Sequence, residues 1–370
     1  MVTERTAALD IVSIVLSFLG VKPFASPQFL IPNGFGSDAA CPQLWVTSVP
    51  FERPRRVQRT VAIQIHWKRR TMHRCEMMIK QYIVDGRGTG HGVNYQPWLQ
   101  ISRRGVPSNG NLVFRPLPVG RHGHFLSRNE WHIAMWLLWL GADDLREQFP
   151  LWPFAHPHPL HGRAELAQNR LPFSSGTLAI ARRLGISHGY FCGTRIPYIG
   201  TTDLMLTTFR QGRCSAVAIA LKPKDMLSRS VEMPQRVRER LALEMAYSAE
   251  LSIPWTLLSD GDISRPLREG LELAVRAAGL QIEPKKQDEY GIALTELLEE
   301  GLSVEDAIGK AQCIFNVDRA SAVAAFHHGI WHRTIPIDIR EPIVMSEPAK
   351  LTDFAWAYRA AAKILGGDGE

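Results

Sequence analysis

The sequence feature that most constrains the fold is the stretch from Thr201 to Lys224, TTDLMLTTFRQGRCSAVAIALKPK. It contains two runs rich in β-branched and large apolar residues, separated by Gln211 and Gly212. Runs of this composition around a Gly-containing turn of about four residues indicate a β-hairpin. We therefore predict strands over residues 202–210 and 216–221.

The charged residues at the open end of this hairpin are Asp203 and Lys222. If Arg210 lies opposite Ser215, Asp203 lies opposite Lys222 and both side chains share one face of the sheet. A carboxylate and an ammonium placed in this way can hold a divalent metal ion and stabilise charge on a phosphate oxygen. They can equally form an ordinary cross-strand ion pair, and these two residues alone do not decide between the interpretations.

A helix with a well-marked start is expected over residues 128–140. Ser127 and Glu130 have the spacing of a capping box, and Gly141 provides a C-terminal stop. The residues between them are apolar on nearly all sides, which predicts a buried helix. Glu130 then either caps this helix or faces the edge of the sheet as a second metal ligand, and the spacing leaves both open.

The flanking pattern predicts a compact α/β or α+β domain over about residues 78–268. A strand or extended edge is expected at 149–154, a helix at 177–184 and a further strand at 255–258. A long helix is expected at 235–250, with a core-facing side formed by Val237, Leu241, Met245 and Ala249.

The C-terminal part is predicted to be helical. Helices are expected at 267–278, at 287–300, from the cap Ser303, and from Asn316 or Asp318 to about residue 328. Residues 329–339 alternate like a hairpin, so three helices and a β-wing would form a winged-helix-like module over 269–345, followed by a tail over 346–370. Acids outnumber bases across 283–341, which favours docking to a protein partner over gripping DNA.

The composition is compatible with an anionic partner. The chain has 370 residues and a formal net charge of +7, which suits a polyanion without proving one. Its five cysteines have no paired spacing, so neither a disulfide framework nor a Cys-type zinc site is expected, and a bacterial cytoplasm fits. The apolar run at residues 10–21 is too short to span a bilayer and follows acidic residues, so no membrane association is expected.

Three segments have two interpretations each. Residues 1–77 are expected to be a partly disordered N-terminal extension, whose basic part at 53–74 is either a phosphate-tracking arm or a solvated lead-in. The glycines of residues 86–92 are not followed by the Lys and Ser or Thr of a P-loop, so a flexible connector is favoured. The stretch AHPHPLH at 155–161 alternates His with Pro, which favours a polar loop over a zinc site.

The order and spacing of these pieces resemble TnsA, the restriction-endonuclease-like subunit of heteromeric transposases. The resemblance runs from about residue 79 to about residue 341. It is carried by GRGTGHGVNYQPWL, SRNE, LREQFPLWPFAHPHPL, IPYIGTTDLML, VAIALKPK and GIWHRTIPIDI. It implies a nuclease domain of the PD-(D/E)xK class with a central mixed sheet over 78–268, followed by the winged-helix-like domain.

The resemblance also implies a site, position by position. Its catalytic residues would be Glu130, Asp203 and Lys222. Glu130, Asp203 and the backbone carbonyl of Leu221 would hold Mg²⁺, for which Mn²⁺ can substitute. Lys222 would stabilise the developing negative charge, with Lys224 as an alternative.

The function that the resemblance implies is hydrolysis of DNA at the 5′ ends of a transposon. The partners would be double-stranded DNA, a TnsB-type recombinase and a TnsC-type ATPase regulator. The family has Glu or Gln two residues before the lysine, where this chain has Ala220. This departure favours one alternative, a weak or inactive subunit that bridges transposase and ATPase to DNA. A transcription factor, argued from the winged helix alone, is a third interpretation.

Overall fold

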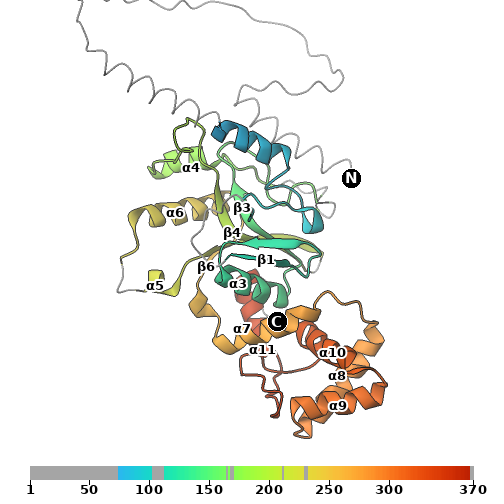
Figure 1. Cartoon of the computed structure of the whole chain (residues 1–370). Coiled ribbons are helices and arrows are strands. Elements are labelled where there is room, and N and C mark those ends of the chain that lie inside the picture. Colours follow the sequence, from blue (N-terminus) through green and yellow to red (C-terminus); the bar gives the residue numbers. More distant parts are fainter. Residues whose placement is uncertain are drawn as a thin grey trace, which may run out of the picture.

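A computed structural model gives the fold (Figure 1). It describes residues 74–101, 112–163, 166, 171–210, 212–228 and 232–366. The apolar run at 10–21 and the basic segment at 53–73 lie outside the described residues, together with most of the predicted N-terminal extension.

A four-stranded mixed sheet forms the centre of the structure (Figure 1). β5 pairs with β4 in antiparallel fashion and with β6 in parallel, while β3 pairs antiparallel with β4. This mixed α/β arrangement is consistent with the restriction-endonuclease-like fold that the resemblance implies. The strands, in spatial order, are β3 (Asp144–Leu151), β4 (Gly200–Arg210), β5 (Arg213–Leu221) and β6 (Trp255–Leu258).

Strand β3 begins earlier than predicted, at Asp144 instead of residue 149. All of its residues are buried, including the charged Arg146 and Glu147. Charged residues inside a strand do not produce an apolar or alternating pattern, so the first half of β3 gave no strand signal.

The hairpin of β4 and β5 has a tighter turn than predicted. Arg210 pairs with Arg213, so only two residues connect the strands. One of them is Gly212, whose φ of 73° suits a two-residue hairpin turn and costs glycine no strain. Ser215 pairs with Thr208 and not with Arg210, so the predicted pairing was wrong.

This register changes the partner of Asp203 but not its face. The pairing of Leu204 with Ile219 places Asp203 opposite Ala220, where Lys222 was predicted. The shift is even, and side chains alternate between faces with a period of two residues. Asp203 and Lys222 therefore remain on the same side of the sheet.

Helix α3 (Arg128–Trp139) covers one face of the sheet (Figure 1). It starts at the predicted cap, where the Ser127 side chain accepts a hydrogen bond from the Glu130 backbone N–H at 3.1 Å. Every residue from Trp131 to Trp139 is buried, as predicted. These residues form one cluster with the sheet residues Leu204, Leu206, Val217 and Ile219.

Helix α6 (Gln235–Glu250) covers the opposite face, beside α4 (Thr177–Leu184), and both helices have the predicted bounds. The predicted core-facing side of α6 was partly wrong, since Met245 is 52% exposed. The residues chosen from the sequence repeat every four positions, so they drift around a helix of about 3.6 residues per turn. The buried side consists of Leu241, Glu244, Tyr247 and Ser248.

The outer edge of β3 is covered by a preceding segment of the same chain. The Trp98 backbone N–H donates to the Gln148 carbonyl at 3.3 Å. The Tyr95 hydroxyl donates to the Glu147 carbonyl at 2.9 Å. Smaller elements surround the sheet: a helix over residues 74–84, η1 (Gly92–Asn94), β1 (Val113–Pro116), β2 (His122–Phe125), α5 (Lys224–Leu227) and η3 (Asp260–Asp262).

The C-terminal part is helical, as predicted. The predicted caps are present, since the Ser303 side chain accepts from the Asp306 N–H and the Asp318 side chain accepts from the Ser321 N–H. The helices are α7 (Arg265–Ala274), η4 (Val275–Ala277), α8 (Pro284–Glu299), α9 (Val304–Phe315), α10 (Arg319–His332) and α11 (Ala355–Leu365).

The hairpin predicted over residues 329–339 was wrong. Residues 329–332 are the last turn of α10, because Ile330 continues the buried stripe that includes Phe326 at helical spacing. Among the described residues that follow, one isolated bridge joins Ile337 to Leu351. The described residues therefore provide the helices of the predicted winged-helix module without its β-wing.

One hydrophobic cluster joins the sheet to the C-terminal helices. It contains residues of α3, β4 and β5 together with residues of α7 to α11, so it runs across the predicted domain boundary at residue 268. The predicted C-terminal tail contains α11, and Trp356 of α11 stacks on Trp139 of α3 with ring centroids 5.4 Å apart. Within the described part of the chain, every helix is too short or too polar to cross a membrane.

Candidate functional site

Asp203 and Lys222 meet at the end of the sheet where β4 begins and β5 ends. The Lys222 ammonium lies 3.8 Å from Asp203 Oδ2, and both side chains are about 15% exposed. Asp203 Oδ2 also accepts a hydrogen bond from the Leu221 backbone N–H at 2.6 Å. Lys222 Nζ donates to the Leu221 carbonyl at 2.7 Å, which is the carbonyl predicted as a metal ligand. The Lys222 ammonium thus contacts both the Asp203 carboxylate and the Leu221 carbonyl.

Glu130 approaches this group from the first turn of α3. Its Oε2 accepts from the Leu126 N–H at 2.8 Å and from the Gln148 side-chain amide at 3.2 Å. Burial, followed by the negative charge of Asp203, raises the pKa of Glu130 to about 8. Glu130 therefore takes part in the start of α3, and the charge of Asp203 is near enough to affect its pKa.

Gln148 contacts Glu130 and was not expected from the sequence. The β3–β4 register pairs Glu147 with Leu204 and Phe149 with Thr202, and the pairing is interrupted between them at Gln148 and Asp203. Gln148 is 1% exposed and has a φ of 49°. A signal that could have located it is a lone amide in a strand that is buried throughout.

Glu244 is a second residue that the sequence did not indicate. It lies on the buried side of α6, 2% exposed, with Oε1 3.2 Å from Arg240 Nε and a buried Oε2 without a hydrogen-bond partner. Burial, followed by the charge of Asp203, raises the pKa of Glu244 to about 7, although Arg240 and Lys222 act in the opposite direction. A glutamate one turn from Leu241 and Tyr247 on the core side of the helix is the signal that could have located it.

The donor set fits a hard divalent cation. The charge of Asp203 adds to burial in raising the pKa of Glu130, and a cation held nearby would act in the opposite direction. Within the described residues, no three or more His, Cys, Asp and Glu side chains are grouped to hold a metal ion. A cation here would therefore depend on two carboxylates, neutral oxygens such as the Leu221 carbonyl, and water, a donor set that Mg²⁺ commonly has in proteins.

The other predicted positions differ in what they contribute. Ala220 is fully buried and places only a methyl group across from Asp203. Lys224 begins α5, and its side chain lies over Gly261. Of the two lysines, Lys222 is therefore the one in contact with Asp203.

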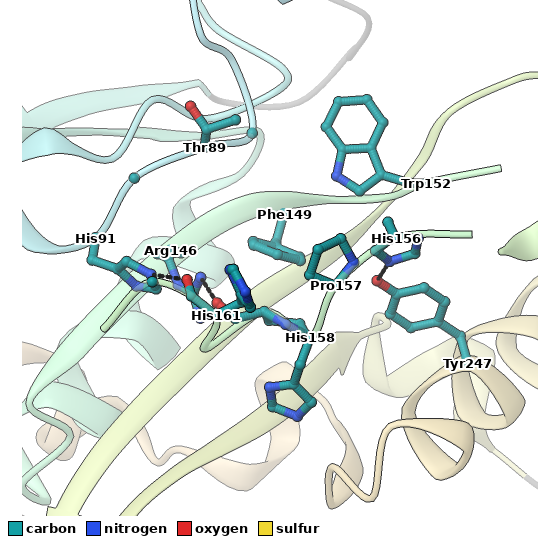
Figure 2. A pocket seen from close by; sticks show the side chains of 14 residues that line it. Thr89, His91, Arg146, Phe149, Trp152, His156, Pro157, His158, His161 and Tyr247 are labelled. Carbon is teal, nitrogen blue, oxygen red and sulfur yellow. Dashed lines mark hydrogen bonds between the residues drawn. The ribbon is translucent and has the colours of Figure 1, made fainter. Parts of the chain in front are cut away.

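The histidines at 156–161 line a separate pocket on the α6 side of the sheet (Figure 2). His156 uses both ring nitrogens, one with the Tyr247 hydroxyl at 2.6 Å and one with the Phe154 carbonyl at 2.7 Å. Figure 2 shows this pair at one end of the pocket and His91 beside Arg146 at the other. Both ring nitrogens of His156 are therefore engaged with protein groups, and His156 and His158 are buried.

Comparison with known proteins supports the resemblance drawn from the sequence. No family model matches the chain. Over 200 residues it is 31% identical to the transposon Tn7 transposition protein TnsA of Escherichia coli. The match covers 53% of this chain and 62% of the relative, so the chain spans less than two thirds of the relative's length. The chain is TnsA-like over this segment.

Proposed function

Because the chain is TnsA-like, we propose that it is the DNA endonuclease subunit of a heteromeric transposase. The reaction is metal-dependent hydrolysis of phosphodiester bonds at the 5′ ends of the transposon. One observation carries this proposal: the Lys222 ammonium lies 3.8 Å from Asp203 at the sheet end that Glu130 also approaches. Two acids and an ammonium in this relation suit hydrolysis of a phosphate ester.

Each side chain has a role in this proposal. Glu130 and Asp203, with the Leu221 carbonyl, hold the cation. When bound, Mg²⁺ or Mn²⁺ polarises the scissile phosphate and acidifies a water molecule. The Leu221 N–H fixes one oxygen of Asp203, which orients that carboxylate. Lys222 stabilises the negative charge that develops on the phosphate.

The partners belong to the same proposal. Double-stranded DNA at the transposon ends is the substrate, and the net charge of +7 favours its approach. A TnsB-type recombinase would process the 3′ ends, and a TnsC-type ATPase would regulate the assembly. The transcription-factor interpretation loses support, because it depended on a β-wing that residues 329–339 do not form.

The substitution that tests this proposal is Asp203→Asn. It keeps the shape of the side chain and the hydrogen bond from the Leu221 N–H, but it removes the negative charge. We expect 5′-end cleavage to fall by about 100-fold or more, because charge at the reacting centre is lost. The measurement is a nicking assay on labelled transposon ends with both partner proteins and Mg²⁺. Asp143→Asn is the matched control: its carboxylate accepts from the Phe209 N–H at the opposite end of the hairpin. Unchanged cleavage by Asp203→Asn would refute the assignment.

A second function is favoured by Ala220. The chain would then be a weak or inactive subunit that bridges the transposase and the ATPase to DNA. This possibility predicts that the parent protein supports assembly of the complex on transposon ends while no cut appears at the 5′ ends. The same assay, with 3′-end joining scored in parallel, separates the two functions.

A further inference from the structure

Gln148 is a buried amide with a specific partner on each side. Its Nε2 donates to Glu130 Oε2 at 3.2 Å, and its Oε1 accepts from the Thr201 hydroxyl at 3.1 Å. Thr201 is itself only 3% exposed. A carboxylate only accepts hydrogen bonds, so the N–H side of Gln148 is directed at Glu130 and its oxygen at the Thr201 hydroxyl, which can donate.

The backbone at Gln148 is in the left-handed region, with a φ of 49°. Glycine adopts this conformation freely and asparagine tolerates it, whereas glutamine has no such preference. Asparagine also carries an amide, but its side chain is one methylene shorter. Glutamine at this strained position is therefore explained if its longer side chain is needed for the amide to contact Glu130.

The position of this amide relates to the group missing at Ala220. Asp203 of β4 lies opposite Ala220 of β5, and on its other side the pairing of β4 with β3 is interrupted at Gln148. The amide or acid expected on β5 is absent, and an amide is present on β3. Leu126 N–H and the Gln148 amide both end on Glu130 Oε2, so two donors fix the same oxygen.

We infer that Gln148 is a positioning residue of the cation site: from β3, its amide holds the Glu130 carboxylate in place. Thr201 holds the amide in the required orientation. This inference rests on the proposed function only in that a divalent cation binds between Glu130 and Asp203. Gln148 acts through Glu130 and needs no contact with the cation.

The test measures Mn²⁺ binding to the full chain without DNA or partner proteins, by electron paramagnetic resonance of free Mn²⁺. The variants are Gln148→Asn, which keeps an amide of shorter reach, and Gln148→Gly, which removes it. Both suit a positive φ, so we expect the melting temperature of Gln148→Asn, which keeps an amide, to stay the same or rise. Gln148→Gly should lower it, because buried groups of Glu130 and Thr201 lose their partner. The Mn²⁺ affinity should fall by about 10- to 100-fold, the usual effect of removing a partner of a metal ligand.

A matched control separates relief of backbone strain from loss of the amide. Ser252 is also a non-glycine residue at positive φ, 57°, in the turn after α6. Ser252→Asn should change the melting temperature in the same direction as Gln148→Asn and leave Mn²⁺ affinity unchanged.

A double-mutant cycle tests the role of Thr201. Thr201→Val keeps the shape but removes the hydroxyl that orients the amide, so Mn²⁺ affinity should fall several-fold in the parent. In the Gln148→Asn background the same change should have no effect, because the hydroxyl acts through Gln148. A purely structural role of Thr201 would give additive effects.

The outcomes separate the inference from the proposed function. If the parent chain binds Mn²⁺ and Gln148→Asn binds it within twofold as tightly, the inference is wrong and the proposed function stands. If the parent chain does not bind Mn²⁺ at millimolar concentration, both are overturned. Reduced affinity in both Gln148 variants, with the control unchanged, supports the inference.

Discussion

Asp203 has different neighbours on its two sides. On the β3 side the strand pairing is interrupted at Gln148, and on β5 the facing residue is Ala220, whose side chain offers no hydrogen-bonding group. The charged contact of Asp203 within 4 Å is Lys222, at 3.8 Å. Position 220 is therefore the place where a single substitution can add a polar group beside this carboxylate.

Ala220→Gln should raise 5′-end cleavage several-fold, because an amide would then face Asp203 from β5. It should also lower the stability by about 1–3 kcal/mol, since Ala220 is fully buried and a larger side chain must be accommodated. Cleavage by the labelled-end assay and thermal melting are the measurements. Ala220→Leu, of similar volume without an amide, is the control. Equal cleavage by the Gln and Leu variants would show that polarity at this position is irrelevant.

At the scale of elements, the loop after β3 contains a histidine that must stay neutral. His158 Nδ1 accepts a hydrogen bond from the Leu160 N–H at 3.1 Å, and protonation of this nitrogen would break that bond. Burial is the largest cause that lowers the pKa of His158 to about 4, and the nearby Arg146 adds to it. The ring is 7% exposed.

This loop should make the fold sensitive to acid. In the unfolded chain His158 titrates near pH 6.5, so between pH 6.5 and 4 the unfolded state binds more protons than the folded state. Stability contributed by neutral His158 is present above pH 6.5 and is lost as the pH falls toward 4. The expected loss of unfolding free energy is about 2 kcal/mol. This is less than the full pKa difference implies, because residual solvent around the ring screens its charge.

His158→Asn should reduce this loss, because an asparagine oxygen can accept the same N–H two residues ahead without titrating. Urea unfolding at pH 7 and pH 4.5 measures the difference. His91, whose pKa burial also lowers to about 4, will keep part of the pH dependence. The exposed His161 provides the control substitution. An unchanged pH dependence in His158→Asn would contradict the role given to this ring.

Local sequence patterns predicted most strands of the sheet and most of its helices, but not the register in which the strands pair. The alternation around Asp203 and Lys222 was enough to place both on one face, because a face depends only on the parity of the register. The pairing itself depended on the turn, where one glycine at positive φ shortened the connection. A strand pattern carries no information on that length.

The polar residues of the site show a different limit. Glu130 was noticed because it lies in the first turn of an apolar helix. Gln148 follows charged residues that gave no strand signal, and Glu244 lies among residues that read as core. The buried environment of these residues is formed by three separate elements that pack together only in the folded chain. Composition and periodicity within one segment cannot predict which elements pack against it.

For the whole molecule, the main question is whether the sheet and the C-terminal helices unfold together. One hydrophobic cluster extends from β4 and β5 through α3 to α11. The stack of Trp139 on Trp356 lies within this connection. A continuous core of this kind predicts a single cooperative transition.

Trp356→Ala should lower the unfolding free energy by about 2 kcal/mol, below the range for fully buried tryptophans because Trp356 is partly exposed. Near-ultraviolet and far-ultraviolet circular dichroism should show coincident melting in the parent and the variant. Lys363→Ala, on the exposed side of α11, should leave the stability unchanged. Two separated transitions in the parent protein would contradict the single core.

The covered edge of β3 has a consequence for assembly. Backbone groups of Glu147 and Gln148 already bond to Tyr95 and Trp98, and β6, at the other side of the sheet, is only four residues long. Neither edge strand offers a long row of unpaired backbone N–H and C=O groups to which a foreign strand could add. Addition of a foreign strand to this sheet is therefore disfavoured, and a partner that docks here would have to recognise side chains and surface shape.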